Sequence, residues 1–173
     1  MIIKTGRFIL RPYQAEDLGS LVESINNKNV SRYLARVPYP YTRKDGQEWL
    51  GKCQQEDSKK EPAEINFVID INGKVIGSIG FSKIENNQAE FGYWLAESYW
   101  NQGIMTEAAK LVIDFGFQQL GLKKIYAHVF EPNTASMKVL EKTGFENKGL
   151  MQEKIKKDGK FYNRHLFVKT ALS

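Results

Sequence analysis

Residues 93–108 read YWLAESYWNQGIMTEA and join the end of a strand pattern to the start of a helix pattern. Ala89–Leu95 alternates like a half-buried strand, and Ile104–Leu120 carries apolar residues at helical spacing. The first N–H groups of a helix lack intrahelical partners and lie at the positive end of its dipole, so they suit phosphate. Gly103 would let a ligand approach the backbone closely. The stretch predicts a strand–loop–helix unit that can hold phosphate.

The same loop disfavours two common classes of nucleotide-binding protein. It lacks the Gly-x-x-x-x-Gly-Lys pattern of a P-loop and the three glycines of a dinucleotide fingerprint. Nucleotide kinases and dehydrogenases are therefore poor interpretations of this sequence, and a single glycine does not by itself identify the ligand.

The segments before this loop indicate helices followed by a meander of strands. Arg7–Arg11 alternates and ends at a proline, which is typical of a first strand, and Asp17–Ile25 places its aliphatic residues on one helical face. A second helix is expected after a capping pair that starts at Thr42. Ile65–Ile71 and Lys74–Lys83 flank an Asn-Gly pair suited to a type I′ turn, so we expect a hairpin there.

The segments after the long helix complete an α/β pattern. Lys124–Phe130 predicts a strand, and Ser136–Thr143 predicts a short helix that ends at a glycine. Glu146–Lys157 and Lys160–Lys169 flank an Asp-Gly pair and predict a closing hairpin. The long helix would cross over between neighbouring strands, so the order predicts a mixed α/β sheet in a single domain over residues 1–173.

Composition and charge narrow the class of protein. The chain is 42% hydrophobic and 26% charged, which is typical of a globular domain, and no apolar run is long enough to span a membrane. The only cysteine, Cys53, excludes an intrachain disulfide and favours a cytoplasmic location. Its polar neighbours predict an ordinary thiol on a surface helix.

The formal net charge of +5 favours anionic partners in general. The basic residues are dispersed, and no helix-turn-helix, zinc-ligand pair or RNA-binding aromatic pattern accompanies them. Direct nucleic-acid binding and a metal site are therefore not expected.

Four segments are informative when they are taken together: RFILRP at Arg7–Pro12, AEFGYWL at Ala89–Leu95, the loop and helix at Trp100–Ala108, and Asn133–Phe145. In order and spacing they resemble the GNAT superfamily of acyl-CoA N-acyltransferases, and within it the bacterial ribosomal-protein N-terminal (alanine/serine) acetyltransferase branch. The resemblance implies acetyl-CoA as the cofactor. It also implies a mostly antiparallel mixed sheet, flanked by helices, that splays between its fourth and fifth strands, Phe91–Leu95 and Lys124–Phe130.

The resemblance also implies which residues hold the cofactor. The superfamily usually begins its pyrophosphate loop with Gln or Arg and ends it with Gly or Ala, where this chain has Trp100 and Met105. Main-chain amides are therefore expected to hold the phosphates, namely those of Gln102, Gly103, Met105 and Thr106. Backbone groups of Trp94 and Leu95 are expected to pair with the pantetheine arm, and Asn133 to contact it near the thioester. Core packing is expected for the side chains of Tyr93 and Trp94.

Acetyl transfer to an amine needs a base, an oxyanion donor and an acid. Glu90 is the expected base, as a partly desolvated carboxylate with a raised pKa, although a solvated carboxylate at the sheet surface is the alternative. The N–H of Leu95 is the expected oxyanion donor. Ser136 is the expected acid, and it also suits a helix N-cap. His128 and His165 are interpreted as structural, because neither has a sequence-adjacent partner.

The sequence thus predicts an acetyl-CoA-dependent N-acetyltransferase whose acceptor is the N-terminal α-amine of a protein, in particular a ribosomal protein. The alternatives are acetylation of polyamines or aminoglycosides, and a catalytically weak acyl-CoA-binding sensor. Two features favour the protein substrate. Leu140 stands where the polyamine branch has a proton-donating tyrosine, and Glu90 is the one carboxylate expected near the cleft, with Glu153 either lining a substrate slot or exposed on its strand. An edge strand in the closing hairpin is compatible with a homodimer.

Overall fold

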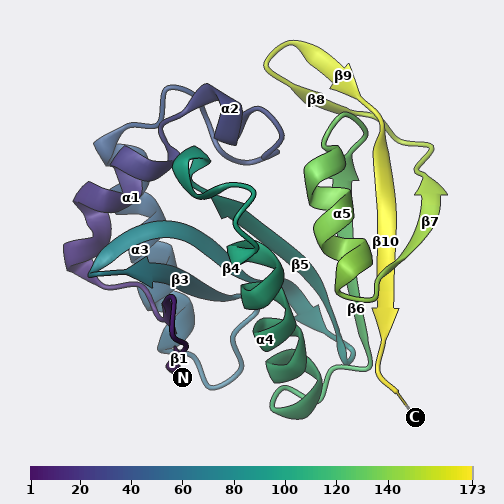
Figure 1. Cartoon of the computed structure of the whole chain (residues 1–173), viewed down its shortest axis with the longest axis horizontal. Coiled ribbons are helices and arrows are strands. Elements are labelled where there is room, and N and C mark those ends of the chain that lie inside the picture. Colours follow the sequence, from purple (N-terminus) through teal and green to yellow (C-terminus); the bar gives the residue numbers. More distant parts are fainter. Residues whose placement is uncertain (173) are drawn as a thin grey trace.

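The computed structural model describes residues 1–172 as an eight-stranded mixed sheet with helices on both faces (Figure 1). The strands in sheet order are β1 (Ile3–Lys4), β2 (Ile9–Arg11), β3 (Ile65–Ile71), β4 (Lys74–Glu85), β5 (Gln88–Leu95), β6 (Lys124–Phe130), β10 (Arg164–Thr170) and β7 (Glu146–Leu150). Only the β5–β6 pair is parallel. The mixed, mostly antiparallel sheet with flanking helices is confirmed.

The helices divide between the two faces of the sheet. Their bounds are η1 (Ala15–Asp17), α1 (Leu18–Ile25), α2 (Lys28–Ser31), α3 (Arg43–Asp57), η2 (Glu97–Tyr99), α4 (Ile104–Gln118) and α5 (Thr134–Lys142). Helices α1 and α3 pack on one face, where Leu21 and Val68 are buried. Helices α4 and α5 cover the other face, where Phe81, Val112 and Leu140 belong to the larger core. Each fully buried side chain of this size contributes about 1.5–3 kcal/mol, so the two cores fix the sheet between the helix layers.

Turn chemistry sets the register of the predicted hairpins. Asn72 and Gly73 have φ values of 54° and 79°, and Asp158 and Gly159 have φ values of 51° and 79°. Type I′ turns need positive φ at both central positions, which Asn, Asp and Gly tolerate. Both turns are confirmed.

The helix starts follow side-chain caps. Thr42 Oγ1 accepts a hydrogen bond from the Asp45 amide at 3.2 Å, and Asp45 Oδ2 accepts one from the Thr42 amide at 2.7 Å, which confirms the cap of α3. Helix α5 starts earlier than expected, because Asn133 Oδ1 accepts from the Ser136 amide at 3.3 Å. Asn133 is therefore the N-cap, and the expectation that Ser136 occupies this position is wrong.

The closing hairpin differs from its prediction. Each of its two long strands is interrupted: β7 and β10 pair in the main sheet, whereas β8 (Ile155–Lys157) and β9 (Lys160–Tyr162) form a separate small hairpin. The turn fixes only the pairing beside it, and β10 then inserts between β6 and β7. The small hairpin is held over the loop after α2, because Lys157 Nζ donates to the carbonyl of Val37. The exposed edge strand is β7, and dimerisation through it remains a prediction.

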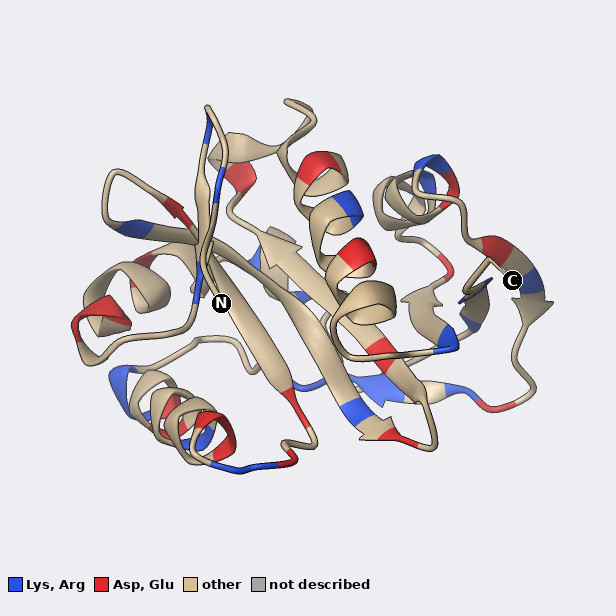
Figure 2. Cartoon of the chain, turned by 90° about the horizontal axis from the view of Figure 1, so that it is seen from below, with Lys and Arg blue, Asp and Glu red and all other residues tan. Residues whose placement is uncertain are grey.

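Cys53 also differs from its prediction. It lies on the inner side of α3 with only 5% of its surface exposed, and burial raises the pKa of its thiol to about 12. The surface-thiol interpretation is wrong, because the polar neighbours in sequence point away from the sheet while Cys53 faces it. Within residues 1–172, no helix is both long and apolar enough to cross a membrane. Charges of both signs are spread over helices, strands and loops (Figure 2).

Candidate active site

Two cavities meet near the end of β5. The first, which we call the α4–α5 cleft, has a volume of about 590 Å³ and lies between the end of β5, the start of α4 and α5. The second, the sheet-face cleft, has a volume of about 520 Å³ and lies between strands β3 to β6, α3 and the loop after α2. The two clefts share the lining residues Tyr33, Leu34, Tyr93, Trp94, Asn133 and Ser136.

The clefts meet because β5 and β6 diverge. The parallel ladder runs only from Gln88–Lys124 to Glu90–Tyr126, and the last five residues of β5 have no partner on β6. The predicted splay between Phe91–Leu95 and Lys124–Phe130 is therefore confirmed. It leaves backbone groups of β5 facing an open gap, which an extended ligand can occupy as an added strand.

The register decides which backbone groups face that gap. The Ala96 amide donates to the Ile76 carbonyl at 2.8 Å, so Trp94, two residues earlier, exchanges its hydrogen bonds with Ser78 on β4. The backbone groups of Tyr93 and Leu95 consequently point away from β4. The backbone groups of Trp94 therefore face β4, whereas those of Tyr93 and Leu95 face the gap; the pairing of any of them with pantetheine stays a prediction.

Trp100 occupies one of the backbone groups of β5 that face the gap. Its indole Nε1 donates to the Leu95 carbonyl at 2.7 Å, which leaves the Leu95 N–H and the Tyr93 backbone groups available for a ligand. The residue that departs from the usual loop pattern thus fixes the corner between β5 and the loop before α4.

The loop before α4 is shaped to receive an anion. Asn101 and Gly103 have φ values of 59° and 75°, and residues of alternating conformation turn their N–H groups toward one side. The first intrahelical bond runs from the Glu107 amide to the Gly103 carbonyl, so the amides of Met105 and Thr106 have no helical partner. Arg7 supports the loop from outside, since its guanidinium donates to the Gln102 carbonyl and lies 3.3 Å from Glu107.

The side chains of the α4–α5 cleft add positive charge. Its charged lining residues are Arg32, Lys138 and Lys142, and no Asp or Glu among residues 1–172 lines it. A positively charged cleft beside backbone amides that have no helical partner favours a phosphorylated ligand.

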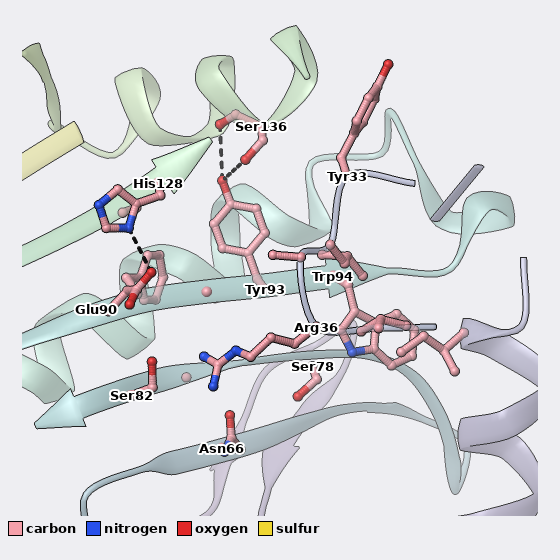
Figure 3. Close-up of a pocket in the computed structure, with 18 of the residues that line it drawn as sticks. Tyr33, Arg36, Asn66, Ser78, Ser82, Glu90, Tyr93, Trp94, His128 and Ser136 are labelled. Carbon is pink, nitrogen blue, oxygen red and sulfur yellow. Dashed lines mark hydrogen bonds and ion pairs between the residues drawn. The ribbon is translucent and has the colours of Figure 1, made fainter. Parts of the chain in front are cut away.

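A pair of hydroxyl groups occupies the junction of the two clefts. Ser136 Oγ lies 2.8 Å from the Tyr93 Oη, and the Tyr93 hydroxyl donates to the Ser136 carbonyl at 3.1 Å (Figure 3). Burial raises the pKa of Tyr93 well above its ordinary value, so the phenol is protonated across the neutral range. Core packing was expected for Tyr93, and its hydroxyl contact with Ser136 went unforeseen, because the two residues are far apart in sequence.

Glu90 has two partners in the sheet-face cleft. His128 Nδ1 lies 2.8 Å from Oε1, and Lys83 Nζ lies 2.6 Å from Oε2 (Figure 3). The hydrogen bond with His128 and the ammonium of Lys83 lower the pKa of Glu90 to about 2, against the opposing effect of burial. The expected raised pKa is wrong, because the sequence did not reveal either partner.

More carboxylates line the sheet-face cleft than expected. Asp45, Glu48 and Glu64 join Glu90, together with three cations, Arg36, Lys52 and Arg164, whereas Glu153 lines neither cleft. Glu64 accepts from Lys52 at 2.8 Å and lies 3.9 Å from Arg36. The cleft therefore carries nearly balanced charge. Of the two positions open for Glu153, the structure shows the exposed one. No group of three or more His, Cys, Asp or Glu side chains in residues 1–172 is placed to hold a metal ion.

Comparison with known proteins identifies the family. The model of the acetyltransferase (GNAT) domain matches residues 7–146, which include both clefts apart from Arg164. The chain belongs to the GNAT acetyltransferase family. It is an acyltransferase, and structures of GNAT relatives with CoA bound support acetyl-CoA as its cofactor. The open edge of β5 and the positive α4–α5 cleft fit the pantetheine and phosphates of such a molecule.

GNAT relatives with different acceptors resemble this chain. It is 31% identical to the probable N-acetyltransferase YjcK of Bacillus subtilis, with 91% of each chain covered. The spermidine N-acetyltransferase from Vibrio cholerae, solved with CoA and spermine, is 25% identical with a TM-score of 0.81 and 96% of each chain covered. The ribosomal L7/L12 α-N-protein acetyltransferase RimL, solved with CoA, shares the fold at a TM-score of 0.87 and 20% identity, with 98% of each chain covered.

Proposed function

We propose that this enzyme acetylates the N-terminal α-amine of a protein in the cytosol, with ribosomal proteins as the substrate class. The observation that carries the proposal is the hydroxyl of Ser136 at the junction of the clefts, 2.8 Å from Tyr93 Oη. This serine occupies the acid position of the ribosomal-protein branch. Leu140, at the position of the tyrosine acid in the polyamine branch, is fully buried and cannot donate a proton.

The geometry supports one arrangement of the cofactor. The amides of Gln102, Gly103, Met105 and Thr106 would hold the pyrophosphate, with Arg32, Lys138 and Lys142 adding positive charge. Pantetheine would extend along β5 from Leu95 toward Tyr93, and Asn133 would lie beside the thioester, where both clefts meet. The acceptor amine would then enter from the sheet-face cleft.

Acetyl-CoA supplies an activated acetyl thioester. In this arrangement the thioester lies beside Tyr93, so the Tyr93 N–H, which also faces the gap, would donate to the oxygen that gains charge when the amine attacks, in place of the Leu95 N–H expected from the sequence. Ser136 would give its proton to the departing sulfur and recover one through its hydrogen bond with Tyr93. The residues at the junction would thus assist cleavage of the carbon–sulfur bond, and the groups of the sheet-face cleft would bind and deprotonate the amine.

The existing ion pairs of two carboxylates in the sheet-face cleft favour an α-amine over a polyamine. A polyamine would have to displace existing partners, because Glu64 is paired with Lys52 and Glu90 with Lys83, and it would meet Arg36 in the same cleft. An α-amine has a pKa of about 7.7–8.0, against about 10.4 for an alkyl amine, so less driving force is needed to deprotonate it.

Polyamine acetylation is the second candidate. The four carboxylates of the sheet-face cleft and the 25% identity to the Vibrio cholerae spermidine N-acetyltransferase favour it. Acetyl-CoA turnover on three matched sets of acceptors decides: peptides with free N-termini, the same peptides with blocked N-termini but a free lysine, and spermidine or spermine.

We expect thiol release only with the free N-termini. Turnover of spermidine without any peptide turnover would contradict the proposal and establish the second candidate. Stabilisation by acetyl-CoA in a thermal shift experiment, without thiol release on any amine, would instead indicate an acyl-CoA sensor.

A further inference from the structure

We propose that His128 is the general base of acetyl transfer and that Glu90 is a positioning residue which orients its imidazole. This inference rests on the acetyl-transfer reaction proposed above, but it holds for any amine acceptor. It reassigns the base from the carboxylate to its histidine partner on the neighbouring strand.

Glu90 is poorly suited to be the base itself. Its side chain is only 18% exposed, and each of its oxygens lies within 2.8 Å of a nitrogen, Oε1 beside His128 and Oε2 beside Lys83. A carboxylate held in this way is stabilised in its charged form, and its pKa falls to about 2. Taking a proton at neutral pH would break both contacts, so Glu90 is a fixed negative charge.

A β-bulge in β4 creates the second of these contacts. The register with β5 shifts between Ser82 and Glu85, and Lys83 within this bulge has a φ of 51°. Bulges re-aim side chains, and a lysine rarely adopts positive φ without a compensating interaction. The bulge turns the ammonium of Lys83 toward Glu90, so the carboxylate is neutralised from the side opposite the imidazole.

The contact with Glu90 fixes the tautomer of His128. An ionised carboxylate can only accept hydrogen bonds, so the neutral imidazole places its proton on Nδ1 and keeps a lone pair on Nε2. His128 lies on the sheet face opposite the core residues Ala127 and Val129, and it lines the sheet-face cleft (Figure 3). The nitrogen that would accept the amine proton is therefore Nε2.

Other charged and titratable groups surround the imidazole without replacing Glu90. Tyr126 packs against the ring and Lys83 reaches it only through Glu90, while Arg36, Arg164, Lys52, Asp45, Glu48 and Glu64 line the same cleft. Glu90 is the carboxylate in contact with the imidazole. When the imidazole accepts a proton, this carboxylate stabilises the resulting cation at a distance of 2.8 Å.

The step balances with one proton on each side. A proton passes from the amine nitrogen to His128 Nε2 while the nitrogen lone pair forms a bond to the acetyl carbonyl carbon. The carbon–sulfur bond then breaks, and the sulfur receives a proton from Ser136. Exchange with solvent removes the proton from His128 and returns one to the Tyr93–Ser136 pair, so the free enzyme is regenerated.

Chemical rescue tests the base directly. His128→Ala should lose about 10²–10⁴-fold in kcat with unchanged affinity for CoA, and added imidazole should restore part of the loss in proportion to its unprotonated form. His165→Ala is the matched control, because His165 contacts Asn147 outside both clefts. We expect wild-type rates for the control and no response to imidazole.

The tautomer tests the role of Glu90 and needs no acceptor. Nitrogen NMR of the folded enzyme should show the His128 proton on Nδ1, and Glu90→Gln should shift the population toward Nε2–H, because an amide can also donate. The same variant should lower kcat without rescue by imidazole.

Three results would overturn the inference. They are a His128→Ala rate within a few-fold of wild type, rescue of Glu90→Ala by formate with no rescue of His128→Ala by imidazole, and a native His128 protonated on Nε2. Failure of the proposed function gives a different result. If the enzyme acetylates polyamines and not peptides, the rescue experiment is run with a polyamine, and His128→Ala should still be rescued by imidazole.

Discussion

The two clefts are built in different ways. The α4–α5 cleft takes its main ligand groups from one continuous stretch, residues 93–106, and from the start of α5, and much of what it offers is backbone. The sheet-face cleft takes side chains from the loop after α2, from α3, from strands β3 to β6 and from β10. Its charges are mixed, whereas those of the α4–α5 cleft are all positive among residues 1–172.

This difference corresponds to two tasks: binding the cofactor, which the whole family shares, and selecting the acceptor, which differs between members. The cofactor is common to the family, so backbone groups in a fixed local geometry suffice to bind it. Two relatives of the same fold, both solved with CoA, are named for a ribosomal protein and for spermidine. We therefore expect the side chains of the sheet-face cleft to select the acceptor, and the predictions below test this division.

The largest effect is expected from Gly103→Pro in the α4–α5 cleft. Proline fixes φ near −65°, whereas Gly103 has a φ of 75°, and proline also removes one amide donor. Affinity for CoA, measured by calorimetry, should fall by about 100-fold or more, since such a backbone change costs about 3 kcal/mol. Circular dichroism should show a largely intact fold, because Gly103 lies in an exposed loop.

Gln102→Ala provides the control for that experiment. It keeps the Gln102 amide and carbonyl and removes only a side chain that donates to the Ser98 carbonyl. Equal losses of CoA affinity in the two variants would contradict a backbone site and would blur the distinction between the clefts.

Ser136→Ala tests the junction, where the two clefts should act together. The variant loses the hydroxyl beside Tyr93 but keeps the amide that Asn133 caps, so the start of α5 should persist. We expect kcat to fall by about 100-fold, at the low end of general-acid contributions, with CoA affinity within a few-fold of wild type. A loss confined to CoA affinity would place Ser136 with the cofactor alone.

The sequence predicted the strand–loop–helix unit of the α4–α5 cleft because its signals are local. The end of β5 and the turn at Gly103 depend on neighbours a few residues away, and turn or helix-end chemistry specifies them. The catalytic side depends on pairs distant in sequence. His128 meets Glu90 across 38 positions, and their contact depends on a register that no local pattern specifies.

The errors have the same physical origin. The pKa of Glu90 was expected to rise because burial was the only visible influence, whereas Lys83 and His128 reverse its direction. The direction of the Trp94 backbone groups toward β4 was not visible either, because strand alternation gives the faces of side chains but not the direction of N–H groups. The bulge in β4 and the insertion of β10 beside β6 are likewise products of the assembled sheet.

An acid titration of stability tests the state of Glu90 in the sheet-face cleft. Its pKa of about 2 lies below the ordinary value of 4.5, so the native state holds this proton more weakly than the unfolded chain does. The stabilisation is complete above pH 4.5 and is lost as the pH falls toward 2. The free energy of unfolding should thus exceed that of Glu90→Gln by a constant amount near neutral pH, about 1–2 kcal/mol once solvent screening is allowed for, and the difference should shrink below pH 4.5.

Glu141→Gln is the control for this titration, because Glu141 is exposed on α5. Its difference from wild type should stay small and flat over the same range in urea denaturation. A flat Glu90→Gln difference would mean that Lys83 and His128 do not hold the carboxylate, and the positioning role would lose its support.

The smallest effect is expected from Trp100→Phe, which removes one hydrogen bond at the edge of the α4–α5 cleft. The indole Nε1 donates to the Leu95 carbonyl at 2.7 Å, and a typical hydrogen bond contributes about 1 kcal/mol. CoA affinity should weaken about fivefold, because the corner that presents the Leu95 N–H becomes less rigid. Calorimetry with CoA should show this change, while the relative kcat/KM values for different acceptors stay constant, since Trp100 does not line the sheet-face cleft. A changed acceptor preference would show that the loop before α4 also shapes the acceptor site, and the two clefts would then have to be treated as one coupled unit.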